Sequence, residues 1–86
     1  MEKQFVYFYF MKNEPAKIQQ VVSSHVSYWK NSNVIGYSGG PFTDRSGGLI
    51  TFKANSFEEA ENLTQRDPFI LNDLLENKWI KEWMIE

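Results

Sequence analysis

Residues 5–11, which read Phe-Val-Tyr-Phe-Tyr-Phe-Met, decide the fold of this chain. Aromatic and β-branched side chains favour strands, and seven residues are enough for a strand but too few to span a membrane. Successive side chains of a strand point to opposite faces, so this run puts apolar groups on both faces. We therefore expect a central strand whose two faces are both covered.

Three helical segments are predicted from residues that favour helix starts. Pro15 fits a first turn, and apolar residues recurring at helical spacing extend that helix to about residue 32. Ser56 and Glu59 form a capping box for a second helix, which runs to about residue 66. Asp67, followed by proline, caps a further short helical turn through about residue 75.

Three more strands complete the pattern, at residues 34–38, 49–54 and 79–85. The segment Gly39-Gly40-Pro41 should break regular pairing at the end of the first of these, and a polar turn with two glycines then predicts a hairpin. The order strand, helix, strand, strand, helix, strand predicts an α+β, ferredoxin-like βαββαβ fold. It has a four-stranded antiparallel sheet with two helices on one face.

The composition suggests that the other face of the sheet is covered by a second copy of the chain. The 86 residues make one domain, residues 1–86, and 16% of them are aromatic. Helices on one side leave rings of 5–11 and 79–85 on the open side, where a contiguous apolar patch typically marks an interface. We therefore expect a homodimer formed through the open sheet face about a two-fold axis.

Several function classes are disfavoured. The net charge of −2 contains no basic block, so we expect no nucleic-acid partner. The apolar run near the N-terminus is too short for a membrane span and no small-residue cleavage site follows, so we expect a cytoplasmic protein with no membrane partner. With one histidine, no cysteine and no phosphate-binding glycine loop, we expect no metal and no cofactor.

His25 is the only histidine, and it lies on the apolar stripe of the first helix. An imidazole there is either a core residue bonded to a backbone carbonyl or the proton-handling group of a site. Asp67 has a sufficient role as a helix cap, but a capping carboxylate can offer its second oxygen to an imidazole. The diglycine before Pro41 is consistent with a strand end or with a close approach of the backbone to a ligand.

These features together resemble the YCII-related (YciI-like) family. The residues that carry the resemblance, in chain order, are His25 with Tyr28, Gly40-Pro41-Phe42, Gly47-Gly48, Ser56–Ala60, Asp67-Pro68-Phe69 and Trp83. The resemblance implies a dimeric α/β barrel of ferredoxin-like subunits and a site in which His25 pairs with Asp67. The family often has a basic residue three positions before the histidine, where this chain has Val22.

The resulting hypothesis is a small-molecule enzyme of isomerase, lyase or hydrolase type. Asp67 would fix the tautomer of His25 and aim its other nitrogen into a cleft, and the pair would act in general acid/base proton transfer. The candidate substrate-binding residues are Tyr28, Gly40, Pro41, Phe42 and Phe69. The alternative is a non-catalytic dimeric module that binds a ligand or a protein, with His25 satisfied inside the core.

Overall fold

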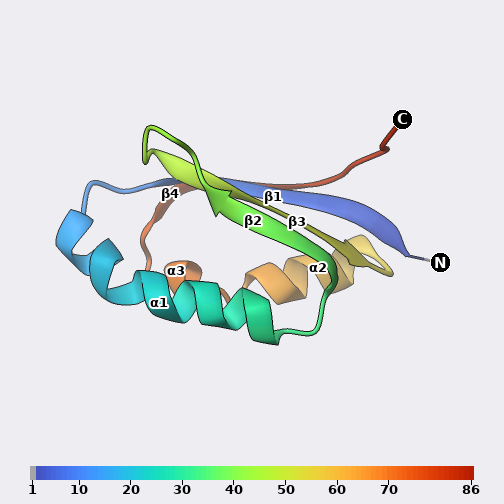
Figure 1. The fold of residues 1–86 in the computed structure, drawn as a ribbon, viewed down its shortest axis with the longest axis horizontal. Helices are drawn as coiled ribbons and strands as arrows, with labels where there is room; N and C mark the ends of the chain where they lie inside the picture. The colour runs from blue at the N-terminus through green and yellow to red at the C-terminus, as the bar shows by residue number, and fades with distance from the viewer. Residues whose placement is uncertain (1) are drawn as a thin grey trace.

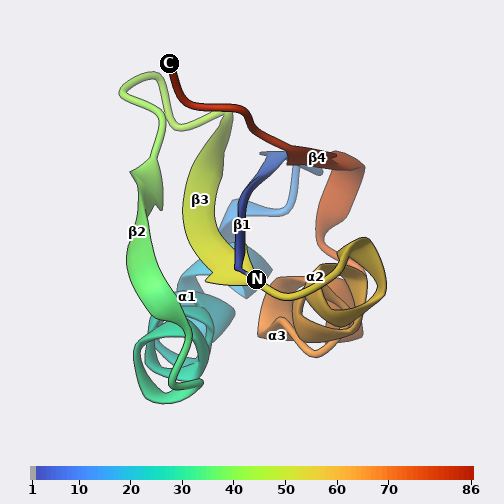
Figure 2. The same cartoon turned by 90° about the vertical axis from the view of Figure 1, so that its right-hand side faces the viewer.

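A computed structural model describes residues 2–86 as an antiparallel sheet with all helices on one face (Figure 1). The sheet has four strands in the order β2-β3-β1-β4. Viewed along the strands, α1 lies under the β2 side of the sheet, and α2 and α3 lie under the β1 and β4 side (Figure 2). The elements are β1 (Lys3–Met11), α1 (Pro15–Asn31), β2 (Ile35–Pro41), β3 (Gly47–Ala54), α2 (Phe57–Thr64), α3 (Pro68–Leu71) and β4 (Leu75–Glu82). The expected α+β ferredoxin-like fold is confirmed.

The core lies between β1 and the helices. Alternation along β1 buries Phe5, Tyr7 and Tyr9 on the helix side. Opposite them on β3, Phe52 pairs with Phe5 and Ile50 with Tyr7, which extends the buried layer across the sheet. Aromatic side chains thus make up much of the surface on which α1 and α3 pack, and the site described below is built on that surface.

The last strand begins earlier than expected. β4 starts at Leu75 rather than residue 79 and ends at Glu82, so the predicted bounds 79–85 were wrong. The helical turn before it is also shorter, because Asp73 adopts a left-handed conformation with φ 54° and the chain reverses there. β4 is an edge strand, and its polar residues face solvent, so hydrophobic alternation could not mark its beginning.

The segment Gly39-Gly40-Pro41 does not break the sheet. Gly39 pairs with Ile50 and Pro41 pairs with Gly48, so β2 stays paired through the diglycine. Proline is tolerated because β2 is the other edge strand and needs no donor on its outer side. The irregularity lies earlier, between Ile35 and Ser38, where Gly36 has φ 69°.

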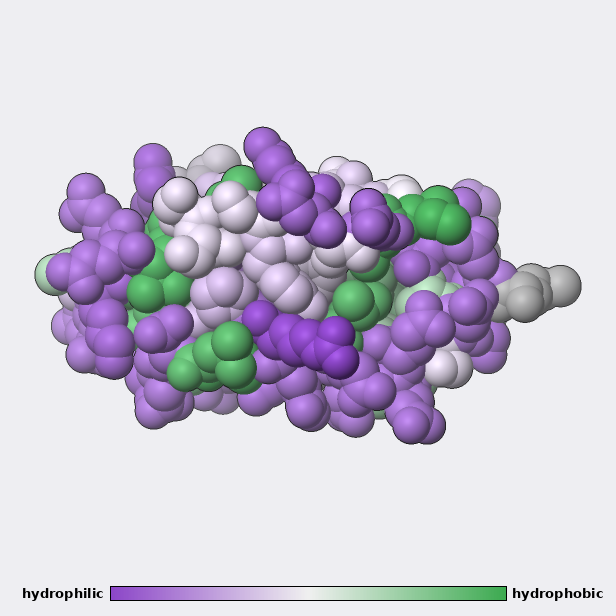
Figure 3. All heavy atoms as spheres, turned by 90° about the horizontal axis from the view of Figure 1, so that it is seen from below, coloured by the Kyte–Doolittle hydropathy of each residue, from purple (hydrophilic) through white to green (hydrophobic). Residues whose placement is uncertain are grey.

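The two faces of the molecule differ in character. Seen from the helix side, the surface is largely hydrophilic, with paler and hydrophobic residues between hydrophilic rims (Figure 3). The open side of the sheet carries an apolar group that we call the open-face patch, namely Phe8, Phe10, Phe42, Leu49 and Trp79. Phe8 and Trp79 stack with ring centroids 5.3 Å apart, and 41% of Trp79 is exposed.

Helix lengths are modest throughout. Within residues 2–86, no helix is both long enough and apolar enough to cross a membrane.

Candidate active site

Asp67 is the centre of a buried polar network. It caps α3 and is completely buried. Its Oδ1 accepts from His25 Nδ1 at 2.7 Å and from the backbone N–H of Phe69 at 2.9 Å. Its Oδ2 accepts from the Trp29 indole N–H at 3.0 Å and from the Tyr7 hydroxyl at 3.4 Å. Each carboxylate oxygen therefore receives two donors, as suits a group that only accepts.

The sequence brings these donors together through helical periodicity and strand alternation. His25 and Trp29 are four residues apart on α1, so they lie one above the other on the same face. Tyr7 reaches Asp67 from the buried face of β1. No buried side-chain nitrogen or oxygen lacks a hydrogen-bond partner in the part of the chain that the structure describes. A buried network satisfied in this way holds its members in one geometry.

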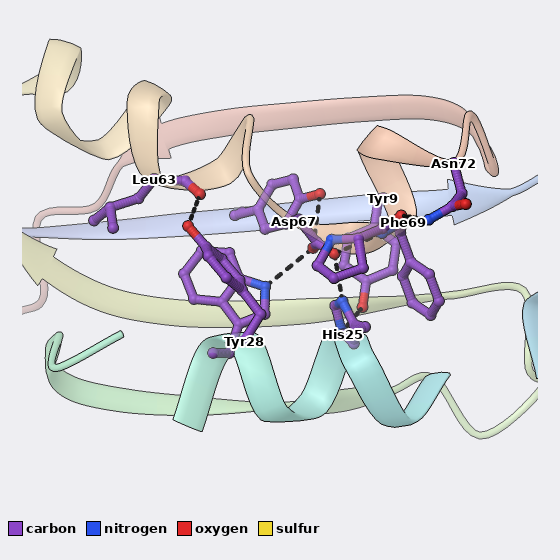
Figure 4. A network of polar contacts seen from close by, with 10 residues as sticks. Tyr9, His25, Tyr28, Leu63, Asp67, Phe69 and Asn72 are labelled. Atoms are coloured by element: carbon purple, nitrogen blue, oxygen red, sulfur yellow. Dashed lines mark hydrogen bonds and ion pairs between the residues drawn. The ribbon is translucent and has the colours of Figure 1, made fainter. Parts of the chain in front are cut away.

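His25 is held on three sides. Because Asp67 accepts at Oδ1, Nδ1 of His25 carries a proton, and in the neutral imidazole Nε2 is then an acceptor. The Tyr9 hydroxyl lies 3.2 Å from Nε2 and donates to it. The imidazole also stacks on the ring of Phe69, with centroids 4.0 Å apart and planes 14° from parallel (Figure 4). These three contacts together fix the orientation of the ring.

The two tyrosines of the network remain protonated at neutral pH. Burial raises the pKa of Tyr7 well above its usual value of 10.0, and the charge of Asp67 adds to the effect. Burial, followed by the charge of Asp67, also raises the pKa of Tyr9. Both hydroxyls are therefore hydrogen-bond donors, as the contacts to Asp67 and His25 require.

A cavity of about 750 Å³ opens beside His25 and Tyr9, between α1 and the β2–β3 hairpin. Asp67 does not line it and lies behind the imidazole. Among the described residues that line the cavity, Lys30 and Arg45 are positively charged and none is acidic. The full lining is Tyr9, Met11, Pro15, Ile18, Gln19, Val22, His25, Val26, Lys30, Tyr37, Gly39, Gly40, Pro41, Arg45, Gly47, Ile50 and Phe69.

Comparison with known proteins agrees with this architecture. A model of the YCII-related domain matches residues 4–84. The chain belongs to the YCII-related family. No curated protein sequence matches it.

Solved structures similar to this YCII-related protein include enzymes. One is 5-chloro-2-hydroxyhydroquinone dehydrochlorinase (TftG) from Burkholderia phenoliruptrix AC1100 in complex with 2,5-dihydroxybenzoquinone, at 20% identity and a TM-score of 0.81, covering 94% of this chain and 93% of that one. Another is SnoaB, a cofactor-independent oxygenase from Streptomyces nogalater, at 11% identity and a TM-score of 0.58, covering 98% and 92%. A third is a dimeric ferredoxin-like protein of unknown function from Thermobifida fusca, at 11% identity and a TM-score of 0.60, covering 99% and 92%. At these identities the likeness shows the fold.

The structure brings together most, but not all, of the site residues expected from the sequence of this YCII-related protein. His25 and Asp67 are joined by a hydrogen bond, and the cavity is lined by Gly40, Pro41 and Phe69.

Two of the expected substrate contacts lie elsewhere. The hydroxyl of Tyr28 donates to the carbonyl oxygen of Leu63, away from the cavity (Figure 4). Phe42 packs on Phe10, with ring centroids 5.7 Å apart, and does not line the cavity. Neither residue belongs to the site proposed below.

Tyr9 is the site residue that sequence reasoning missed. The signal for it was present, because alternation along β1 puts Tyr9 on the same face as Phe5 and Tyr7. What the alternation does not give is the position of His25 along α1 relative to that strand.

Within residues 2–86, no group of three or more histidine, cysteine, aspartate or glutamate side chains is placed so that it could hold a metal ion.

Proposed function

We propose that this YCII-related protein is a small-molecule enzyme in which His25, oriented by Asp67, performs general acid/base proton transfer. The observation that carries the proposal is the 2.7 Å contact between His25 Nδ1 and Asp67 Oδ1 in an imidazole that also lines the cavity. A base must reach both its orienting partner and its substrate, and His25 has one ring nitrogen for each.

The chemistry follows from the tautomer. Nδ1–H of His25 is hydrogen-bonded to the carboxylate, so in the neutral imidazole Nε2 carries no proton and can take one from a substrate. The imidazolium that forms is stabilised by the buried carboxylate of Asp67 and can return the proton to another atom. Such a step is common to isomerases, lyases and hydrolases, and a positioned base contributes about 10²–10⁴-fold to its rate.

The cavity supports a small, partly apolar substrate. Phe69, whose ring stacks on the imidazole, lines the cavity, and Gly40 with Pro41 lines it from β2. A volume of about 750 Å³ is within the range of pockets for small molecules. The existence of enzymes with this fold, one of them bound to 2,5-dihydroxybenzoquinone, adds support for a small-molecule substrate.

A purely structural role for His25 has less support. A core histidine typically satisfies its second nitrogen on a backbone carbonyl, which it cannot exchange for a ligand. Here the partner of Nε2 is the hydroxyl of Tyr9, a residue that itself lines the cavity. Both members of that contact therefore belong to residues that border the cavity.

The test is a thermal-shift screen of small metabolites, followed by a turnover assay of each hit by ¹H NMR. A ligand at a hundredfold its Kd should stabilise the protein by about 2.7 kcal/mol. We expect His25→Gln to lower turnover by about 10²–10⁴-fold while a hit still binds. Unchanged turnover in this variant would exclude the imidazole as the base.

The same enzyme is proposed to be a homodimer that pairs its open-face patches. Phe10, Leu49 and Trp79 are each more than a third exposed there, although the three side chains are apolar. Such a patch costs free energy in water and suits a self-complementary contact about a two-fold axis. The dimeric ferredoxin-like protein from Thermobifida fusca supports this arrangement. Sedimentation equilibrium at micromolar concentration tests it, and a monomer would contradict it.

A further inference from the structure

The contact between Tyr9 and His25 puts a proton donor and a proton acceptor side by side at the cavity wall. The Tyr9 hydroxyl and Nε2 of His25 are 3.2 Å apart, and both residues line the cavity. At that length the hydrogen bond is at the weak end of the normal range, so a substrate that offers each group a better partner can replace it.

We propose that Tyr9 and His25 act together as an acid/base pair that interconverts the keto and enol forms of an enolisable carbonyl compound. This inference rests on the proposed function of His25 and adds to it both a catalytic residue and a substrate class. In such a compound the carbonyl oxygen and the carbon that loses the proton are about 2.4 Å apart, from standard bond lengths and angles. Two groups 3.2 Å apart can therefore contact these two atoms at the same time.

The step balances within the pair. Nε2 of neutral His25 takes the proton from the carbon next to the carbonyl, and the electrons of that C–H bond form the carbon–carbon double bond. The carbonyl π electrons move to oxygen, which takes the proton of the Tyr9 hydroxyl. The imidazolium then returns a proton to the Tyr9 oxygen across their own contact. The net change is the movement of one hydrogen from carbon to oxygen, and both side chains end as they began.

Two features of the structure suit Tyr9 to this role. Its raised pKa, caused first by burial, keeps the hydroxyl protonated and makes the phenolate unfavourable, which favours return of a proton from the imidazolium once the substrate oxygen has taken the proton of Tyr9. The hydroxyl also lies close against the backbone of β3, since a Cβ on Gly48 would lie 2.6 Å from it. A donor fixed before the reaction costs no reorganisation when negative charge develops on the substrate oxygen.

The rest of the cavity narrows the substrate class. Lys30 and Arg45 are the charged residues among its described lining, and most of the remaining lining is apolar or aromatic. A carbonyl compound with an apolar body and a carboxylate fits this combination. Phenylpyruvate has these features and can enolise, whereas benzoylformate has them but carries no hydrogen on the carbon next to its ketone.

The experiment measures exchange of carbon-bound hydrogen with D₂O by ¹H NMR, using phenylpyruvate, its methyl ester and cyclohexane-1,3-dione as probes. We expect the wild-type protein to accelerate exchange of at least one probe, and benzoylformate to inhibit competitively. Tyr9→Phe should lower kcat by about 10²-fold with little change in KM, since the lost donor acts on the developing oxyanion. Tyr28→Phe is the matched control, because it removes a tyrosine hydroxyl outside the cavity, and should keep the wild-type rate.

The outcomes separate this inference from the proposed function. If Tyr9→Phe keeps the wild-type rate while His25→Gln loses it, the role of Tyr9 is wrong and His25 stands as the base. If no probe exchanges faster than in buffer, the carbonyl substrate class is wrong, and the metabolite screen still decides the role of His25. Benzoylformate inhibition that persists in Tyr9→Phe shows that this variant is folded and that a loss of kcat is chemical.

Discussion

Asp67→Asn probes the polar network most directly, because it keeps the size of the side chain and replaces one acceptor oxygen by a donor. Each oxygen of Asp67 faces one partner that can only donate, the backbone N–H of Phe69 at Oδ1 and the indole N–H of Trp29 at Oδ2. Whichever way the amide is turned, its NH₂ group meets one of these N–H groups. One buried donor therefore loses its partner.

The expected loss of stability follows from that count. An unsatisfied buried donor costs about 1–3 kcal/mol, and the surviving hydrogen bonds lose the contribution of the charge, about 1 kcal/mol in all. The sum is about 3 kcal/mol. A small domain has about 5–15 kcal/mol of stability, so the variant should fold but unfold at a clearly lower denaturant concentration.

Urea unfolding followed by tryptophan fluorescence, at one fixed protein concentration, measures this loss. The midpoint should fall while the slope m stays the same. Asp44→Asn is the matched control, because Asp44 lies in an exposed turn, where hydrogen bonds from Ser46 lower its pKa and an asparagine can replace it. A loss below about 1 kcal/mol in Asp67→Asn would refute the reasoning, since the four donors would not then require a carboxylate.

Three further predictions concern glycines next to the site, the buried tyrosines and the open face of the sheet. In thermal unfolding, Gly47→Ala should lower the stability of the protein by about 3 kcal/mol, because its Cβ would lie 1.8 Å from the backbone oxygen of Tyr9. Gly40→Ala should change the stability by no more than about 0.5 kcal/mol, because its Cβ would meet nothing within 4 Å. Tyr7 and Tyr9 have raised pKa values in the folded protein, so the stability that their protonated hydroxyls contribute is complete below pH 10 and is lost as the pH rises further. Ultraviolet titration should find both tyrosines un-ionised until the protein unfolds. Ionisation of either tyrosine near pH 10 in the folded state would contradict this prediction. Trp79→Lys should yield a folded monomer by sedimentation equilibrium, and a persistent dimer would remove the open-face patch from the interface.

Local sequence signals predicted most of the fold, and they failed where the outcome depended on the position of a strand in the sheet. The capping residues Ser56 and Asp67 sit directly before their helices, because a cap is a local arrangement of a side chain and the next backbone N–H groups. The segment Gly39-Gly40-Pro41 of β2 was misjudged, because whether its proline interrupts strand pairing depends on β2 being an edge strand. The start of β4 was missed for the same reason, since an edge strand needs no apolar alternation.

The residues of the candidate site likewise include some that the sequence predicted and some that it did not. The pairing of His25 with Asp67 was expected from the resemblance to the YCII-related family, and helical spacing explains why Trp29 joins them. Tyr9 was not expected, because no local pattern relates a strand position to a helix position far along the chain. Tyr28 was expected in the site because it is close to His25 in sequence. Residues three apart on a helix differ by about 60° in direction, so nearness along α1 did not bring Tyr28 to the cavity.

The two roles weighed for Asp67, helix cap and partner of His25, turn out to be one arrangement. Both use Oδ1, which accepts from the Phe69 backbone and from the imidazole together. The cap fixes the carboxylate, and the carboxylate fixes the tautomer and direction of the ring, so the start of α3 is also what orients the base. No substitution at Asp67 can therefore separate stability from catalysis. That separation has to come from the cavity side of the network, at Tyr9, where a change leaves the cap and the four hydrogen bonds of Asp67 in place.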